Sequence, residues 1–143
     1  MNDPLQLLPH GPSFRFIDAM EALVPGKSGS ACYLLRGDEG FLSGHFPGNP
    51  IMPGVLMIEA VAQLGGVVAQ SDTDIPALGD LRLTAVQNAK ILGTASPGAT
   101  IKLTAEVLGR MDGLVMIHGQ ATVDGQVILT ARVTLSGVPA SRG

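Results

Sequence analysis

The fold is decided by residues 51–70, whose sequence is IMPGVLMIEAVAQLGGVVAQ. Most of this stretch is apolar all round, and only Glu59, Gln63 and the Gly65-Gly66 pair interrupt it. A proline stands near its start, where it is tolerated because the first N–H groups of a helix have no intrahelical partner. We therefore predict a helix from about Gly54 to about Gln70. A helix that is apolar on every side must be buried on every side.

Such a helix could lie in a membrane or inside a protein core. The stretch approaches the roughly 20 apolar residues that a bilayer requires. Against a membrane span, Glu59 lies near its centre, and no Lys or Arg occurs between Arg36 and Arg82. The rest of the chain is rich in predicted strands. The sequence therefore favours a central helix packed against an antiparallel sheet, in an α+β domain.

Runs of β-branched and apolar residues predict the sheet. Asp112-Gly113 and Asp124-Gly125 stand between such runs, and Asp-Gly is a strong hairpin signal because both central residues of a type I′ turn need positive φ. We expect three or four consecutive antiparallel strands in the second half. The alternation in Thr100 to Leu108 gives that strand one dry face, and Ala31, Tyr33 and Leu35 share one face of the second strand. The predicted strands are Phe14 to Val24, Lys27 to Arg36, Leu81 to Leu92, Thr100 to Leu108, Leu114 to Val123 and Val127 to Leu135.

Composition predicts one domain spanning residues 1–143. The chain has 143 residues, of which 45% are hydrophobic and 15% charged. This apolar content excludes intrinsic disorder, because such a chain can bury a core. The low charge leaves little polar surface to cover the outside, which favours a buried subunit interface.

Charge and cysteine usage exclude other classes. A net charge of −3, 3% aromatic residues and the lack of a basic run do not suit nucleic-acid binding. Cys32 is the only cysteine, so no internal disulfide can form. The first ten residues carry no basic n-region, so we expect no secretory signal and a cytoplasmic protein. Since His10, His45 and His118 lack ligand-like spacing, we expect no metal site.

The densest group of chemically useful residues leads into the predicted helix. Residues 44–54 read GHFPGNPIMPG, and three prolines fix the backbone of this loop. The loop would hold His45 beside the N–H groups at the start of the helix, which can stabilise an oxyanion. Glu59 lies about one and a half turns inside the helix, where burial should raise the pKa of its carboxyl and suit it as a proton donor. Gln63 follows at i+4 on the same face. From spacing alone, purely structural roles for His45 and Glu59 stay open.

Residues 44–63, GHFPGNPIMPGVLMIEAVAQ, resemble the signature of the 3-hydroxyacyl-acyl-carrier-protein dehydratases of fatty acid synthesis, of the FabZ type. Upstream, Leu8-Pro9-His10 and the segment from Phe14 to Asp18 resemble the opening of that family. The resemblance implies the hotdog fold, in which a curved antiparallel sheet wraps a long central helix. It also implies a homodimer, often assembled into a trimer of dimers, with His45 of one chain facing Glu59 of the other.

The resemblance further implies a reaction that needs no cofactor. A (3R)-3-hydroxyacyl thioester on acyl carrier protein would lose water to give the trans-2-enoyl thioester. His45 would remove the C2 proton, and Glu59 would protonate the leaving C3 hydroxyl. The Gly54 N–H would polarise the thioester carbonyl, the Ile51 carbonyl would orient the His45 ring, and Gln63 would support Glu59. We also expect one helix face to line a tunnel for the acyl chain, with the wall residues Leu56, Ile58 and Val61.

Some choices stay open at this stage. Glutamate at position 59, together with Pro47, favours by resemblance the type that only dehydrates over the type that also isomerises. The aromatic and arginine-rich stretch usual in the family is missing here, because residues 87–93 offer only Lys90. The same fold could serve a specialised acyl or polyene pathway, act on coenzyme A thioesters, or form a non-catalytic acyl-binding subunit. Candidate charges for docking the carrier protein are Arg82, Lys90, Lys102, Arg110 and Arg132.

Overall fold

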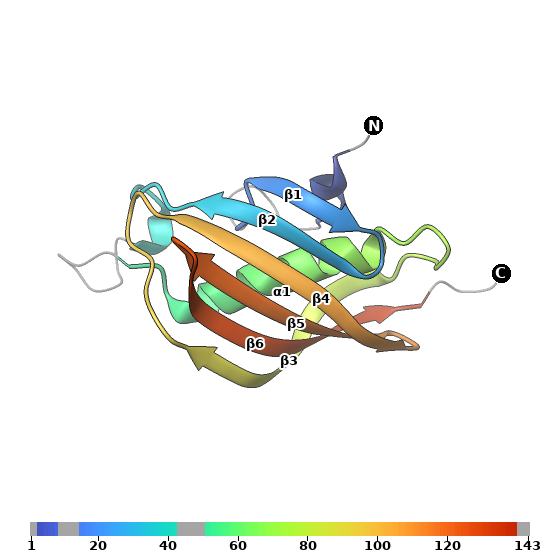
Figure 1. Ribbon diagram of the computed structural model, residues 1–143. Coiled ribbons are helices and arrows are strands. Elements are labelled where there is room, and N and C mark those ends of the chain that lie inside the picture. Colours follow the sequence, from blue (N-terminus) through green and yellow to red (C-terminus); the bar gives the residue numbers. More distant parts are fainter. Residues whose placement is uncertain (1–2, 9–14, 43–50, 140–143) are drawn as a thin grey trace.

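The computed structural model describes residues 3–8, 15–42 and 51–139, and these form one antiparallel sheet wrapped around one long helix (Figure 1). This architecture confirms the α+β prediction. In chain order the elements are the 3₁₀ turn η1 (Pro4–Leu7), β1 (Ala19–Val24), β2 (Ser28–Leu34), the 3₁₀ turn η3 (Gly40–Leu42), α1 (Gly54–Gln70), β3 (Gly79–Ile91), β4 (Thr100–Met111), β5 (Leu114–Val123) and β6 (Gln126–Val138).

Helix α1 has the predicted bounds, Gly54–Gln70, and supplies the centre of the core. The sheet encloses most of it, and Val61, Leu64, Val67 and Val68 are completely buried. The expectation of burial on every side was wrong, because Val55 is 69% exposed. The sheet packs against most of the helix, and the remaining lengthwise stripe of the helix faces a cavity. None of the helices in the described residues is long and apolar enough to cross a membrane.

The strands are ordered β1-β2-β4-β5-β6-β3, and all neighbouring pairs are antiparallel. Three consecutive strands, β4 to β6, therefore form a meander as expected. The third strand does not continue it: β3 pairs with β6 at the edge, and the chain then crosses to the centre of the sheet, where β4 pairs with β2. At the Asp124-Gly125 turn both residues have positive φ, 52° and 79°, as a type I′ turn requires. At Asp112-Gly113 only Asp112 does, so that turn is of another type.

Alternation along the strands directs apolar side chains onto the helix. Ile101, Leu103 and Ala105 on β4 are buried. Ala31, Tyr33 and Leu35, which we predicted to share one face of the second strand, are buried as well. The sheet also approaches the helix backbone closely at Gly119 on β5. A Cβ atom there would lie 2.6 Å from the Cβ of Val61.

The first strand is shorter than predicted. It begins at Ala19 rather than Phe14, which itself lies outside the described residues. Phe16 and Ile17 are buried, but the Phe16 N–H donates to the side-chain oxygen of Gln63 on α1, at 2.9 Å, instead of to a neighbouring strand. This contact holds the segment before β1 against the helix, so apolar residues there do not mark a strand.

Candidate active site

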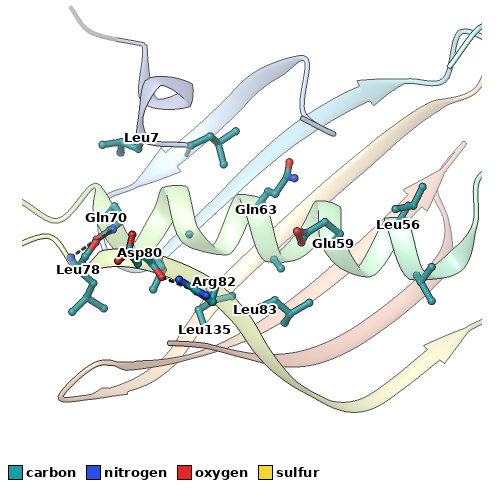
Figure 2. Close-up of a pocket in the computed structure, with 15 residues that line it drawn as sticks. Leu7, Leu56, Glu59, Gln63, Gln70, Leu78, Asp80, Arg82, Leu83 and Leu135 are labelled. Carbon is teal, nitrogen blue, oxygen red and sulfur yellow. Dashed lines mark hydrogen bonds between the residues drawn. The ribbon is translucent and has the colours of Figure 1, made fainter. Parts of the chain in front are cut away.

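The stripe of α1 that the sheet does not contact forms one wall of a cavity of about 570 Å³. The helix contributes Glu59 and Gln63 to it, while β3 and the buried Leu135 on β6 form the opposite wall (Figure 2). Leu7 and Leu8 near the N-terminus complete the lining. A largely apolar space with a carboxyl group in its wall is suited to an extended apolar ligand with one reactive polar end.

Glu59 lies in this wall and is half-buried. Val55 precedes it on the cavity side by one helical turn, and Ala62 and Gly66 follow it on the same side. The other faces of the helix are packed on the sheet. The helix therefore presents the carboxyl to the cavity and keeps it out of the core, where burial of a charged group is costly.

Gln63 is 2% exposed, and its side-chain oxygen accepts the hydrogen bond from Phe16 N–H. It thus connects the helix to the segment before β1, a role that its i+4 spacing from Glu59 did not indicate. Gln63 also contributes to the cavity wall beside Glu59. The predicted support of Glu59 by Gln63 stays a prediction.

Gly54 begins α1, and Pro53 before it offers no side-chain cap. Because the first residues of a helix have no intrahelical acceptor, N–H groups at this end can bind an oxyanion. The Ile91 side chain at the end of β3 lies so near that a Cβ on Gly54 would collide with its Cδ1 atom. Ile51 precedes this start and is half-buried, and the next residue, Met52, is fixed by a 2.9 Å bond from its N–H to the Ala95 carbonyl.

His45 lies outside the described residues, so its predicted place opposite Glu59 stays a prediction. The chain on either side of residues 43–50 is well anchored. Leu42, 5% exposed, and Met52, 2% exposed, both belong to the hydrophobic core.

A polar network before Leu42 was not foreseen from the sequence. Glu39 Oε2 accepts hydrogen bonds from the Tyr33 hydroxyl at 2.9 Å and the Arg36 N–H at 3.0 Å, and Oε1 accepts from the Gly37 N–H at 2.8 Å. Burial tends to raise the pKa of Glu39, but these donors together hold it below its ordinary value. Burial first, and then the bond to Glu39, raise the pKa of Tyr33. The Arg36 guanidinium also pairs with Asp18 at 2.8 Å.

Two of the three predicted tunnel residues do not line the cavity. Leu56 lies in its wall, whereas Ile58 and Val61 are buried among the core residues. The reason is helical geometry, since residues two and five positions after Leu56 point away from its face. The residues that line the cavity from α1 are Val55, Leu56, Glu59, Ala62, Gln63, Gly66 and Gln70.

Several of the candidate docking charges have partners within the chain. Arg110 donates to the Ala69 carbonyl at the end of α1, at 2.9 Å, and Arg82 donates to the Asp80 carbonyl at 3.4 Å. Lys102 lies 3.9 Å from Glu21. His118 is paired in register with Glu106 and Arg132 and lines two shallow hollows formed by the strands, apart from the helix cavity. In the described part of the chain, no group of three His, Cys, Asp or Glu residues could hold a metal ion.

Comparison with known proteins gives the family. The model of the FabA-like domain matches residues 8–132. A 3-hydroxyacyl-acyl-carrier-protein dehydratase FabZ from Syntrophotalea carbinolica is 37% identical over 145 residues, covering 98% of this chain and 95% of that protein. The FabZ protein of Clostridium acetobutylicum is 37% identical over 130 residues, covering 91% of this chain and 92% of that protein.

Solved structures confirm the fold. The dehydratase heterocomplex ApeI:P from Xenorhabdus doucetiae aligns with a TM-score of 0.79 at 16% identity, covering 99% of this chain and 93% of that one. The protein smu.793 from Streptococcus mutans, solved with acetyl CoA, aligns with a TM-score of 0.68 at 14% identity, covering 94% and 98%. With a matching domain model and relatives of this identity along nearly its whole length, the chain belongs to the FabZ family of 3-hydroxyacyl-acyl-carrier-protein dehydratases.

Proposed function

We propose that this member of the FabZ family removes water from (3R)-3-hydroxyacyl chains held as thioesters on acyl carrier protein, giving trans-2-enoyl thioesters in fatty acid biosynthesis. The single observation that carries the proposal, beside the family, is the position of Glu59 in the wall of a largely apolar cavity. An acyl chain can occupy this space while its C3 hydroxyl meets the one carboxyl in the helix face.

In the proposed reaction His45 accepts the C2 proton, and the electron pair of the broken C–H bond forms the C2–C3 double bond. Glu59 donates a proton to the C3 hydroxyl as the C3–O bond breaks, so water leaves and the atoms balance. Negative charge develops on the thioester oxygen during the first step, and the Gly54 N–H at the start of α1 is suited to stabilise it. A side chain at position 54 would collide with Ile91. Glycine at this position also lets the thioester approach the backbone. The Ile51 carbonyl would orient the His45 ring, and Gln63 would support Glu59.

The test is a dehydration assay on purified protein, with 3-hydroxyacyl chains on acyl carrier protein and on coenzyme A, followed by the ultraviolet absorbance of the enoyl thioester. We expect turnover on the carrier protein, and a loss of about 10²–10⁴-fold in kcat for His45→Ala and for Glu59→Gln. Met111→Lys, at a residue 71% exposed at the end of β4, serves as the surface control and should retain the wild-type rate.

Each alternative has its own outcome in this assay. A strong preference for coenzyme A thioesters would assign the protein to another acyl pathway. Acyl binding without turnover would make it a binding subunit. A rate that survives His45→Ala would contradict the mechanism.

We also infer that residues 1–143 act as one domain in a cytoplasmic homodimer, which can assemble further into a trimer of dimers. Its partner is the acyl carrier protein. The dimer is supported by the exposed edge of β3, where Val86 is 46% and Ile91 56% exposed. Lys90 and Arg132, both exposed, border one small hollow near the end of β3 and are the cations we propose for the acidic carrier.

A further inference from the structure

The cavity follows α1 for more than two turns beyond Glu59. Ala62, Gly66 and Gln70 line it in succession, at spacings of three and four residues that keep them on one face of the helix. Figure 2 shows Glu59 towards one end of this face and Gln70 towards the other, beside Leu78.

Two adjacent glycines on this helix have different surroundings. A Cβ on Gly65 would lie 2.9 Å from two side-chain carbons of Ile117, so close packing on the sheet excludes a side chain there. A Cβ on Gly66 would lie 3.6 Å from Leu81 Cδ2 and 3.8 Å from Leu135 Cδ1, which are ordinary contacts. Packing therefore does not require glycine at position 66, and glycine also destabilises a helix interior. A larger side chain at this position would extend into the cavity.

The distance between Glu59 and Gly66 indicates which part of the acyl chain would lie beside Gly66. An α-helix rises about 1.5 Å per residue, so Gly66 lies roughly 10 Å along the axis from Glu59, about the length of eight carbons of an extended chain. Because C3 of the substrate would lie at Glu59, the carbon beside Gly66 would be about the eleventh of the acyl chain. Beyond it, Gln70 closes the space against Leu78 through two hydrogen bonds, from Gln70 Nε2 to the Leu78 carbonyl at 2.7 Å and from the Leu78 N–H to Gln70 Oε1 at 3.0 Å. This reciprocal pair makes a fixed end to the cavity.

We propose that Gly66 determines acyl chain length: its missing side chain lets acyl chains longer than about eleven carbons extend past this position towards the Gln70–Leu78 pair. The inference rests on the proposed function and adds the substrate class, namely 3-hydroxyacyl groups of long chain. A Gly66→Leu substitution would place a branched side chain across the path, whereas Gly66→Ala would add only a methyl group.

The test compares wild type, Gly66→Ala and Gly66→Leu on acyl chains of about four, about eight and about sixteen carbons. For Gly66→Leu we expect kcat/KM on the shortest chain within about twofold of wild type and a loss of about 10- to 100-fold on the longest. Gly66→Ala should show a smaller loss in the same order. Gly65→Ala is the matched control, since its clash with Ile117 should lower the rate for all chain lengths by a similar factor.

Size-exclusion chromatography and thermal unfolding accompany the assay. Equal losses at all lengths for Gly66→Leu, or an unchanged rate on the longest chain, would overturn the inference and leave the proposed function intact. Dissociation of the oligomer in Gly66→Leu would overturn it too, by making the stripe a subunit contact. A wild-type protein inactive on every hydroxyacyl thioester would contradict the proposed function instead.

Discussion

At the scale of single residues, the network around Glu39 shows how a carboxylate can organise a loop. Its two oxygens accept from two backbone N–H groups and from the buried Tyr33 hydroxyl. The same loop continues into η3, where the Leu42 N–H donates to the Glu39 carbonyl at 3.0 Å. Glu39 therefore fixes the chain that leads from β2 towards residues 43–50.

The charge of Glu39 makes this contribution dependent on pH. Because its folded-state pKa lies below the ordinary value, the contribution is present above the ordinary pKa of about 4.3 and is lost as pH falls through the lower folded-state value. We expect Glu39→Gln to lower the free energy of unfolding by about 1–3 kcal/mol at neutral pH, and by less at acidic pH.

Urea unfolding of wild type and variant at neutral pH and near pH 3 measures both values. Asp38→Asn, a neighbouring exposed carboxylate, is the control and should change little at either pH. A difference between wild type and Glu39→Gln that stays constant with pH would contradict the assigned role of the charge.

At the scale of elements, the contact between α1 and β5 depends on a glycine in the strand. A Cβ on Gly119 would lie 2.6 Å from the Val61 Cβ, and neither backbone has room to withdraw because both elements lie in the core. We expect Gly119→Ala to destabilise the protein by about 1–3 kcal/mol through overpacking.

Gly66→Ala, which meets only ordinary contacts, should instead raise the free energy of unfolding by up to about 1 kcal/mol through helix propensity. Denaturant unfolding of both variants checks the opposite signs, and equal effects would contradict this packing.

The elements also show what the sequence can predict. Helix α1 and strand β5 begin and end where they were predicted, because local periodicity and turn residues determine both. The pairing of β3 with β6 was not predicted, since a strand partner some 50 residues away leaves no local signal. Glu59 was identified from the motif, but the role of Gln63 towards Phe16 and the network of Glu39 depend on contacts that form only in the fold.

At the scale of the whole molecule, the sheet ends in a strand that is apolar on the helix side but not covered there. Val86 is paired in register with Val133 and Ile91 with Leu129, both fully buried, so Val86 and Ile91 face the same side as the helix. They are nevertheless 46% and 56% exposed. In the described residues β3 pairs with β6 alone, which leaves its other edge open. An open edge beside exposed apolar side chains is suited to pairing with a second copy of the chain.

This edge gives a test of the dimer and of the shared active site together. Val86→Lys places a charge in the proposed interface, and we expect the variant to sediment as a monomer. At the same protein concentration, its free energy of unfolding should fall only by the contribution of the lost interface. Since His45 of one chain is proposed to act with Glu59 of the other, the monomer should lose at least about tenfold in dehydration rate. Met111→Lys adds the same charge at a more exposed apolar residue away from β3, and should keep both the dimer and the rate. A Val86→Lys monomer with the full rate would show that one chain holds a complete site, because no partner would then be needed to supply the histidine.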